Sequence, residues 1–145
     1  MSEIMLKRNS GFTLVELLIV VSIIGILTGV VIGVINPNKV RGRARDGVRK
    51  NDIAVIKGAL ENYYSENNIY PDDVPFGGTW SQYLKIVPQD PLVAKGFSYC
   101  YETPDSNNFV LCTQVEDENS SSVPNGVTPC GGIAAASAYC VQNPF

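Results

Sequence analysis

The sequence predicts an α+β fold in which a long N-terminal α-helix, transmembrane in its first half and amphipathic in its second, packs on a small antiparallel β-sheet head. Three observations predict this fold. A long apolar run lies near the N-terminus, apolar residues then recur at helical spacing, and two segments of alternating side chains flank a turn sequence farther on. Because the apolar run and the residues before it take up the first 35 of 145 residues, the core of the head is small.

The apolar run extends from Phe12 to Ile35 and contains one charged residue, Glu16. At about 1.5 Å per residue, a helix of this length crosses the roughly 30 Å hydrocarbon core of a bilayer. The run is too long for an ordinary secretory signal, and Lys7 and Arg8 before it favour a cytoplasmic N-terminus. Residues 12–35 are therefore predicted as a transmembrane helix, and an isolated carboxylate inside such a helix indicates a function.

The amphipathic half follows a predicted kink or break at Asn36-Pro37, because proline lacks the helical N–H and clashes with the preceding turn. Helical spacing then resumes and continues as far as NNIYP. The apolar residues at steps of three and four are Ile53, Ile56, Leu60, Tyr63 and Tyr64. Residues 36–69 are therefore predicted as a helical stem with an apolar stripe that the head covers.

The head, residues 70–145, is rich in Pro, Gly, Asn and Ser. Trp80, Leu84 and Val87 have helical spacing and predict one short helix within TWSQYLKIV. Segments 97–102 and 109–116 alternate with period two around TPDSNN and predict a β-hairpin. Its apolar face is expected to pack on the stem and consists of Phe97, Tyr99, Tyr101, Phe109, Leu111 and Val115. The C-terminal CGGIAAASAYCVQNPF gives no clear pattern.

Composition argues against an enzyme. The chain has no histidine, which excludes Ser-His and Cys-His catalysis and histidine metal sites, and no cofactor or metal is predicted. Charge is unevenly placed: residues 1–50 hold eight Lys/Arg and three Asp/Glu, whereas residues 51–145 hold three and eleven. A basic front and an acidic back can attract one another between copies of the chain.

Six of the cations lie between Lys39 and Lys50, beyond the predicted membrane span. The positive-inside tendency alone would place this basic run in the cytoplasm, opposite to the orientation that Lys7 and Arg8 favour. Pairing of the run with acidic heads of adjacent copies is the favoured interpretation. Plain solvation, lipid headgroups, anionic envelope polymers and nucleic acid are alternatives, and nucleic acid is not favoured.

The four cysteines all lie in the head, and none has the C-x-x-C spacing of a zinc site. They indicate disulfides and an oxidising compartment. Period-two alternation places Cys100 and Cys112 on the same side of the hairpin and nearly opposite each other, which predicts a Cys100–Cys112 bond and leaves Cys130 with Cys140. The alternative is a long staple from either hairpin cysteine to Cys130 or Cys140.

Gly11 followed by FTLVELLIVVSIIGIL, after a short leader with basic residues, resembles the N-terminus of type IV prepilins and type II secretion pseudopilins. The resemblance is close over residues 7 to about 35. It implies that residues 1–11 are a leader, that prepilin peptidase cuts between Gly11 and Phe12 on the cytoplasmic side, and that the new amino group is methylated. Glu16 would then neutralise the Phe12 amine of a neighbouring subunit or of its own chain.

Small residues on the apolar helix complete the predicted assembly site. Ser22, Gly25, Gly29 and Gly33 follow at steps of three and four, which places them on one face and favours close helix packing. In the family this face lies in a filament core. Family members usually carry their helix-disturbing proline a few residues before Pro37, where this chain has Gly33.

The acidic loop of residues 116–122 has Glu116, Asp117, Glu118 and Asn119 followed by three serines. Major pseudopilins bind Ca²⁺ in a comparable C-terminal loop, but this spacing fits no defined ligand pattern. A solvated acidic loop is the favoured interpretation.

The resemblance implies a structural subunit of a type IV pilus-like extracellular filament, with a pilin-like fold, assembled from the membrane by pilus or secretion machinery. The subunit would begin as a single-pass inner or plasma membrane protein with an extracytoplasmic head and would end in an extracellular or periplasmic polymer of like or unlike pilin subunits. A pseudopilin of a type II secretion system is the alternative within the family. A monomeric membrane-tethered binding module, with residues 39–50 as its basic ligand site, is the alternative from another class.

Overall fold

The computed structural model describes residues 11–143. The predicted leader, residues 1–11, lies outside the described residues except for Gly11. The chain divides into two compact units, residues 1–37 and 38–145, and each is described separately.

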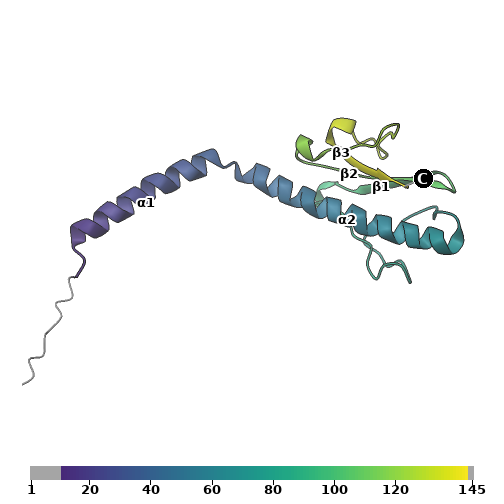
Figure 1. The fold of residues 1–145 in the computed structure, drawn as a ribbon, viewed down its shortest axis with the longest axis horizontal. Helices are drawn as coiled ribbons and strands as arrows, with labels where there is room; N and C mark the ends of the chain where they lie inside the picture. Colours follow the sequence, from purple (N-terminus) through teal and green to yellow (C-terminus); the bar gives the residue numbers. More distant parts are fainter. Residues whose placement is uncertain (1–10, 144–145) are drawn as a thin grey trace, which may run out of the picture. The chain divides into compact units, whose positions relative to one another are not determined.

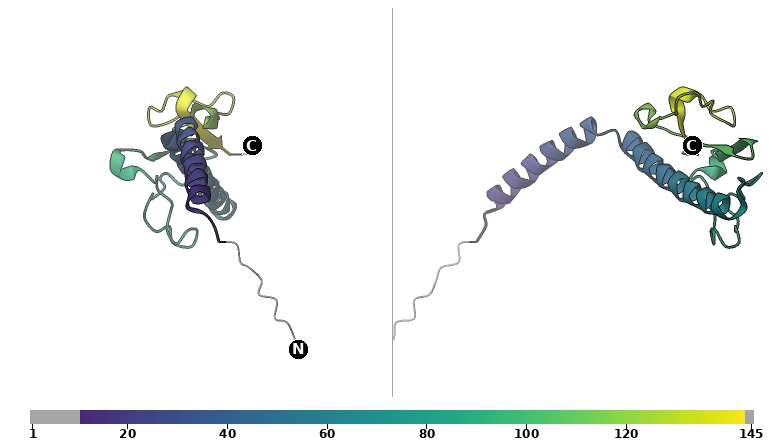
Figure 2. Two further views of the ribbon diagram at one scale, coloured as in Figure 1. Left: turned by 90° about the vertical axis from the view of Figure 1, so that its left-hand side faces the viewer. Right: turned by 45° about the vertical axis from the view of Figure 1, so that its right-hand side comes forward.

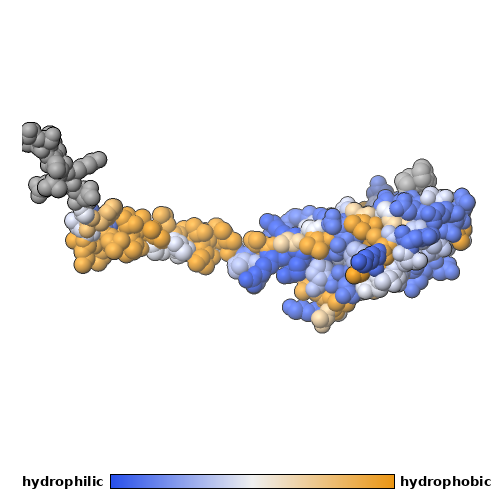
Figure 3. Space-filling view, turned by 90° about the horizontal axis from the view of Figure 1, so that it is seen from below, coloured by the Kyte–Doolittle hydropathy of each residue, from blue (hydrophilic) through white to orange (hydrophobic). Residues whose placement is uncertain are grey.

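The first unit contains helix α1, Leu14–Val34 (Figure 1). Thr13 caps its N-terminus, and the helix ends where Ile35 turns to extended backbone while its N–H still bonds the carbonyl of Val31. The helix is long and apolar enough to cross a membrane, none of its residues is buried, and its surface is almost wholly apolar (Figure 3). An apolar helix that the described part of its own chain leaves uncovered needs lipid or other subunits around it.

The second helix, α2, covers Pro37–Asn67. Ile35 and Asn36 separate it from α1, which confirms the break predicted at Asn36-Pro37. Proline at the first helical position costs no hydrogen bond, because the N–H there has no partner within the helix. Proline also disfavours helical backbone at the residue before it, so Pro37 both ends α1 and starts α2. Asn68, with φ of 57°, ends α2 in the left-handed conformation and donates its N–H to the carbonyl of Tyr64.

Three antiparallel strands form one sheet in the order β1-β2-β3: β1 Tyr99–Asp105, β2 Asn108–Gln114 and β3 Ala138–Gln142. The predicted hairpin is confirmed, but its strands run farther into the turn than expected. The register pairs Cys100 with Cys112 and Glu102 with Val110, and it shifts between Glu102 and Asp105. Strand β3 was not predicted. Three short 3₁₀ turns complete the described elements, at Val93–Lys95, Glu118–Ser120 and Ala135–Ser137.

The sheet has two covered faces, with α2 on one side and the segment of residues 121–137 on the other (Figures 1 and 2). The expected packing of the hairpin's apolar face on the stem is confirmed for Tyr99, Tyr101, Phe109 and Leu111. The buried residues of this core are Ile53, Ile56, Leu60, Tyr70, Val74, Val87, Tyr99, Phe109 and Leu111. The opposite face carries Cys112, Ala138 and Cys140, packed against Cys130 and three aliphatic side chains of the covering segment.

The prediction of a short helix within TWSQYLKIV is wrong. Residues 80–84 form a tight turn closed by mutual hydrogen bonds of Trp80 and Leu84, and Ser81 has a φ of 37°, which no α-helix accommodates. Trp80 and Tyr83 both contact the ring of Tyr63, with centroids 5.9 and 5.2 Å away. Aromatic packing on α2 therefore decides the conformation of this segment, not its local spacing.

The predicted local disulfides are also wrong: the structure joins Cys100 to Cys130 and Cys112 to Cys140, the long-staple alternative. Cys112 lies in the central strand and therefore faces Cys100 on one side and Cys140 on the other. The N–H of Cys140 donates to the carbonyl of Ser122 and so points away from β2. Cys112 and Cys140 therefore form a non-hydrogen-bonded pair, the kind in which side chains approach most closely. Their Cα atoms are 4.1 Å apart.

Candidate functional site

The N-terminus of α1 brings Glu16 close to the predicted cleavage site. Thr13 donates both its backbone N–H and its hydroxyl to Oε2 of Glu16, each at 2.8 Å, while the Glu16 N–H donates to the Thr13 hydroxyl at 3.2 Å. This reciprocal capping box was not predicted, although the Thr-x-x-Glu spacing before an apolar run is a sequence signal for one. It holds the carboxylate at the start of the helix against Thr13, the residue that follows Phe12.

The four small residues of the predicted packing face all lie in α1. The Ser22 hydroxyl donates to the carbonyl of Leu18 at 2.7 Å, so its polar group is satisfied within the helix. At Gly25, Gly29 and Gly33 an added Cβ would meet no atom within 4 Å. The face is therefore open, and its packing against another subunit remains a prediction.

A second site lies between α2 and the head, around the fully buried side chain of Arg49. Its guanidinium donates to Asp90 from Nε at 2.7 Å and from Nη2 at 3.1 Å, and its Nη1 donates to Asp46 and to Glu116, both at 2.8 Å. Asp46 and Asp90 are as buried as the arginine. Phe97 lies against the guanidinium, with its ring centroid 5.1 Å from Cζ. We call Arg49, Asp46, Asp90 and Glu116 the arginine cluster.

Asp46 connects this cluster to the backbone. Its carboxylate accepts the N–H of Glu116 at 3.0 and 3.1 Å and the N–H of Asp117 at 2.9 Å. Gly42, one turn earlier in α2, lies against Glu116, where an added Cβ would stand in ordinary van der Waals contact, 3.4 Å from Cβ of Glu116. The chain leaving β2 is thereby fixed to the first half of α2 by charge-assisted hydrogen bonds.

Two further arginines extend the contact toward solvent. Arg45 makes a two-pronged pair with Glu116, and Arg43 donates to Asp117. The structure therefore corrects two interpretations of the sequence: these cations of the basic run pair with carboxylates of their own chain, and Glu116 and Asp117 are ion-paired residues of the acidic loop, not solvated ones. This pairing also lowers the unbalanced positive charge beyond the membrane span.

The arginine cluster was not predicted from the sequence, although one signal was present. Asp46 and Arg49 continue the buried stripe of α2 toward its N-terminus, at steps of three and four before Ile53 and Ile56. Charged residues in register with an apolar stripe indicate a buried ion pair. Asp90 and Glu116, which are 41 and 67 residues from Arg49, carried no such signal.

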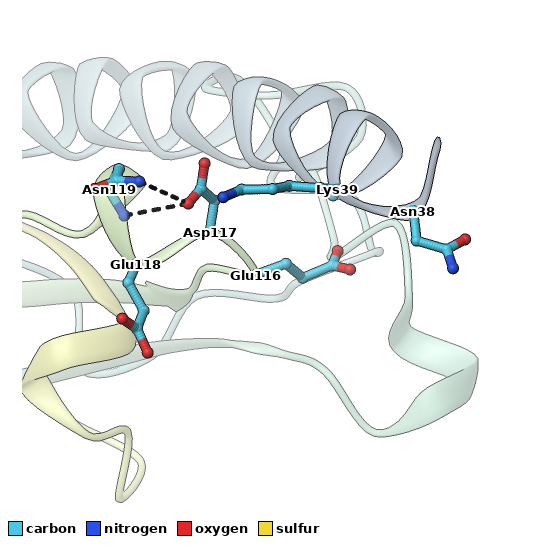
Figure 4. Close-up of a pocket in the computed structure, with 7 residues that line it drawn as sticks. Asn38, Lys39, Glu116, Asp117, Glu118 and Asn119 are labelled. Atoms are coloured by element: carbon cyan, nitrogen blue, oxygen red, sulfur yellow. Dashed lines mark hydrogen bonds between the residues drawn. The ribbon is translucent and has the colours of Figure 1, made fainter. Parts of the chain in front are cut away.

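A hollow of about 410 Å³ lies at the start of α2 and is lined by the acidic loop (Figure 4). Asp117 accepts two hydrogen bonds from Asn119 on Oδ1 and one from Arg43 on Oδ2, and Lys39 extends toward it. Both carboxylate oxygens of Asp117 are therefore engaged by the protein. A cation in this loop would compete with Arg43 and Asn119 for the carboxylate of Asp117.

The ion pairs of Glu116 predict that the free energy of unfolding depends on pH. Its hydrogen bonds from Arg45 and then Arg49 lower its pKa from about 4.5 to about 2. Because the folded pKa lies below the unfolded value, the stabilisation is complete above pH 4.5 and is lost as pH falls toward 2. We expect Glu116→Gln to lower the free energy of unfolding by about 1–2 kcal/mol at pH 7. Urea unfolding of this variant should also lose less stability between pH 5 and pH 2 than wild type does.

Glu118→Gln is the matched control, since Glu118 is an exposed neighbour outside the ion pairs. If the free energy of unfolding depends on pH equally in the wild type and in Glu116→Gln, the ion-paired Glu116 is not a source of the pH dependence.

Known proteins are similar to this chain both in the apolar helix and in part of the head. Residues 6–32 match the prokaryotic N-terminal methylation motif. Type II secretion system core protein G of Pseudomonas aeruginosa is 34% identical over 113 residues, covering 68% of this chain and 76% of that protein. The core protein G of Aeromonas hydrophila is 32% identical over 100 residues, covering 59% and 68%.

A type IV major pilin, PilA of Myxococcus xanthus, is 40% identical over 67 residues, which cover 45% of this chain and 29% of the pilin. No solved structure gives a significant match. The chain belongs to the family of type IV pilins and type II secretion pseudopilins.

Proposed function

We propose that this chain is a structural, non-catalytic subunit of a type II secretion pseudopilus. One observation carries the choice within the family: similarity to three of the core G proteins extends over 100 to 119 residues and so includes part of the head, whereas similarity to PilA covers 67. The pilus-like filament that the sequence favoured is the second candidate, because identity to PilA is higher over that shorter segment.

Maturation begins with hydrolysis of the Gly11–Phe12 peptide bond by prepilin peptidase, followed by methylation of the Phe12 amine. The new amine lies one residue before the capping Thr13. Both Thr13 bonds use Oε2 of Glu16, which leaves Oε1 to accept the ammonium group of its own or a neighbouring chain. Pairing neutralises two charges that are each costly in an apolar environment.

Assembly then transfers α1 from lipid to protein. The helix starts as a membrane anchor with the head on the extracytoplasmic side, and polymerisation by the secretion or pilus machinery covers its exposed apolar surface with α1 helices of other subunits. Ser22, Gly25, Gly29 and Gly33 provide the face on which those helices approach most closely. The arginine cluster keeps the head fixed to α2 during this transfer.

Gly11→Val tests the processing site. A bulkier residue at the scissile bond should not fit a peptidase that acts after glycine, so the variant should accumulate as an unprocessed, membrane-retained precursor. Intact-mass measurement of the membrane fraction distinguishes precursor from mature chain. Gly33→Val, the same exchange far from the bond, should be processed normally. A normal mature mass for Gly11→Val would remove the assignment of the cleavage site.

A further inference from the structure

The sulfur atoms of two different disulfides lie together on the sheet face opposite α2. The sulfurs of Cys100, Cys112 and Cys130 are within 4.8 Å of one another, although Cys112 is bonded to Cys140. Cys112, Cys130 and Cys140 are buried, with 0%, 3% and 3% of their surface exposed. Cys100 is the one of the four that remains partly exposed.

The backbone of Gly131 lies directly against Cys100. With a φ of 63°, this residue adopts a conformation that side chains disfavour, and an added Cβ would stand 3.1 Å from Cβ of Cys100 and 3.5 Å from its sulfur. Gly132 follows with a φ of 71°, and the turn is closed by a bond from the Ile133 N–H to the Cys130 carbonyl. A larger residue at position 131 would be strained and would crowd Cys100.

We infer that Cys100 is a site of thiol–disulfide exchange. It is attacked by the thiolate of an external dithiol, such as that of an extracytoplasmic oxidoreductase. Cys130 then passes the exchange on to the buried Cys112–Cys140 bond. This inference rests on the positions of the sulfurs and is independent of the type of filament. Exchange requires a thiolate within reach of a disulfide sulfur, and accessibility decides which sulfur is attacked first.

The exchange proceeds in three balanced steps. The external thiolate bonds to the sulfur of Cys100, the Cys100–Cys130 bond breaks, and Cys130 leaves as a thiolate. The second thiol of the dithiol then displaces Cys100, so the dithiol is oxidised and the protein gains two electrons. Finally, the Cys130 thiolate attacks Cys112, forming a Cys112–Cys130 bond and releasing Cys140 as a thiolate.

Limited reduction of the folded wild-type chain tests the sequence of events. Dithiothreitol is added in limiting amount at about pH 8, the reaction is quenched with acid at intervals, and free thiols are alkylated before peptide mapping. We expect free thiols first at Cys100 and Cys130, and then a Cys112–Cys130 linked peptide with free thiols at Cys100 and Cys140. Thiols appearing first at Cys112 and Cys140, or loss of both bonds without a Cys112–Cys130 species, would overturn the inference.

Paired variants test the relay. In Cys100→Ser/Cys130→Ser, the remaining Cys112–Cys140 bond should be reduced at least about ten-fold more slowly than in wild type, because its route of attack is gone. In Cys112→Ser/Cys140→Ser, the Cys100–Cys130 bond should be reduced at the wild-type rate. Reduction of Cys112–Cys140 at the wild-type rate in the first variant would overturn the relay. If circular dichroism shows that a variant is unfolded, the wild-type mapping decides alone.

Discussion

Glu16→Ala should yield a correctly processed chain that forms at least about ten-fold fewer filaments, because removing one member of a pair in an apolar environment costs roughly 3–5 kcal/mol. The Phe12 ammonium group would be left without its carboxylate among apolar helices. Quantification of sheared filaments, with intact-mass measurement of the membrane fraction, separates assembly from processing. An unprocessed precursor in this variant would show that Glu16 acts at the cleavage step instead.

The capping box provides a sharper variant. Alanine removes the Thr13 hydrogen bonds as well as the charge, and loss of a cap alone costs about 0.5–2 kcal/mol. Glutamine at position 16 retains a capping acceptor but has no charge. We expect Glu16→Gln to assemble as poorly as Glu16→Ala. Wild-type filament yield from Glu16→Gln would show that the carboxylate caps the helix and does not pair with the amine.

Arg49→Met should lower the free energy of unfolding of the head by about 3–5 kcal/mol. The substitution leaves the buried Asp46 and Asp90 carboxylates without their shared cation, and Glu116 loses one of its two arginines. Methionine fills a similar volume, so the loss reflects charge and hydrogen bonding more than a cavity. Urea unfolding of the detergent-solubilised mature chain at neutral pH, followed by circular dichroism, gives the value.

Arg41→Met is the matched control, because Arg41 is an exposed cation of the same helix, outside the arginine cluster. Its free energy of unfolding should stay within about 0.5 kcal/mol of wild type. If Arg49→Met and Arg41→Met have the same free energy of unfolding, the buried ion pairs do not fix the head to α2.

The parts of the fold that the sequence predicted are those that depend on local patterns. The apolar run, the break before Pro37 and the stripe from Ile53 to Leu60 each follow from residues within a few helical turns of one another. The hairpin followed from alternation around one turn. Helix periodicity and strand alternation are readable because neighbours in sequence decide which face is buried.

The parts that failed depend on contacts between distant residues. The disulfide pairing was decided by β3, which reaches Cys112 from 28 residues away and has a mixed composition that predicted no strand. The turn at Trp80 follows from its packing on Tyr63. Likewise, Arg49 meets Asp90 and Glu116 only after α2, the loop before β1 and the end of β2 have come together. Such tertiary contacts override local preference.

The most direct test of a processed filament subunit is mass spectrometry of sheared, purified extracytoplasmic filaments. We predict a mature chain that begins at Phe12 with a methylated amino group and contains two disulfides. A chain that retains its leader, found as a monomer in the membrane and absent from filaments, would contradict the assignment as a filament subunit and would favour a membrane-tethered binding module.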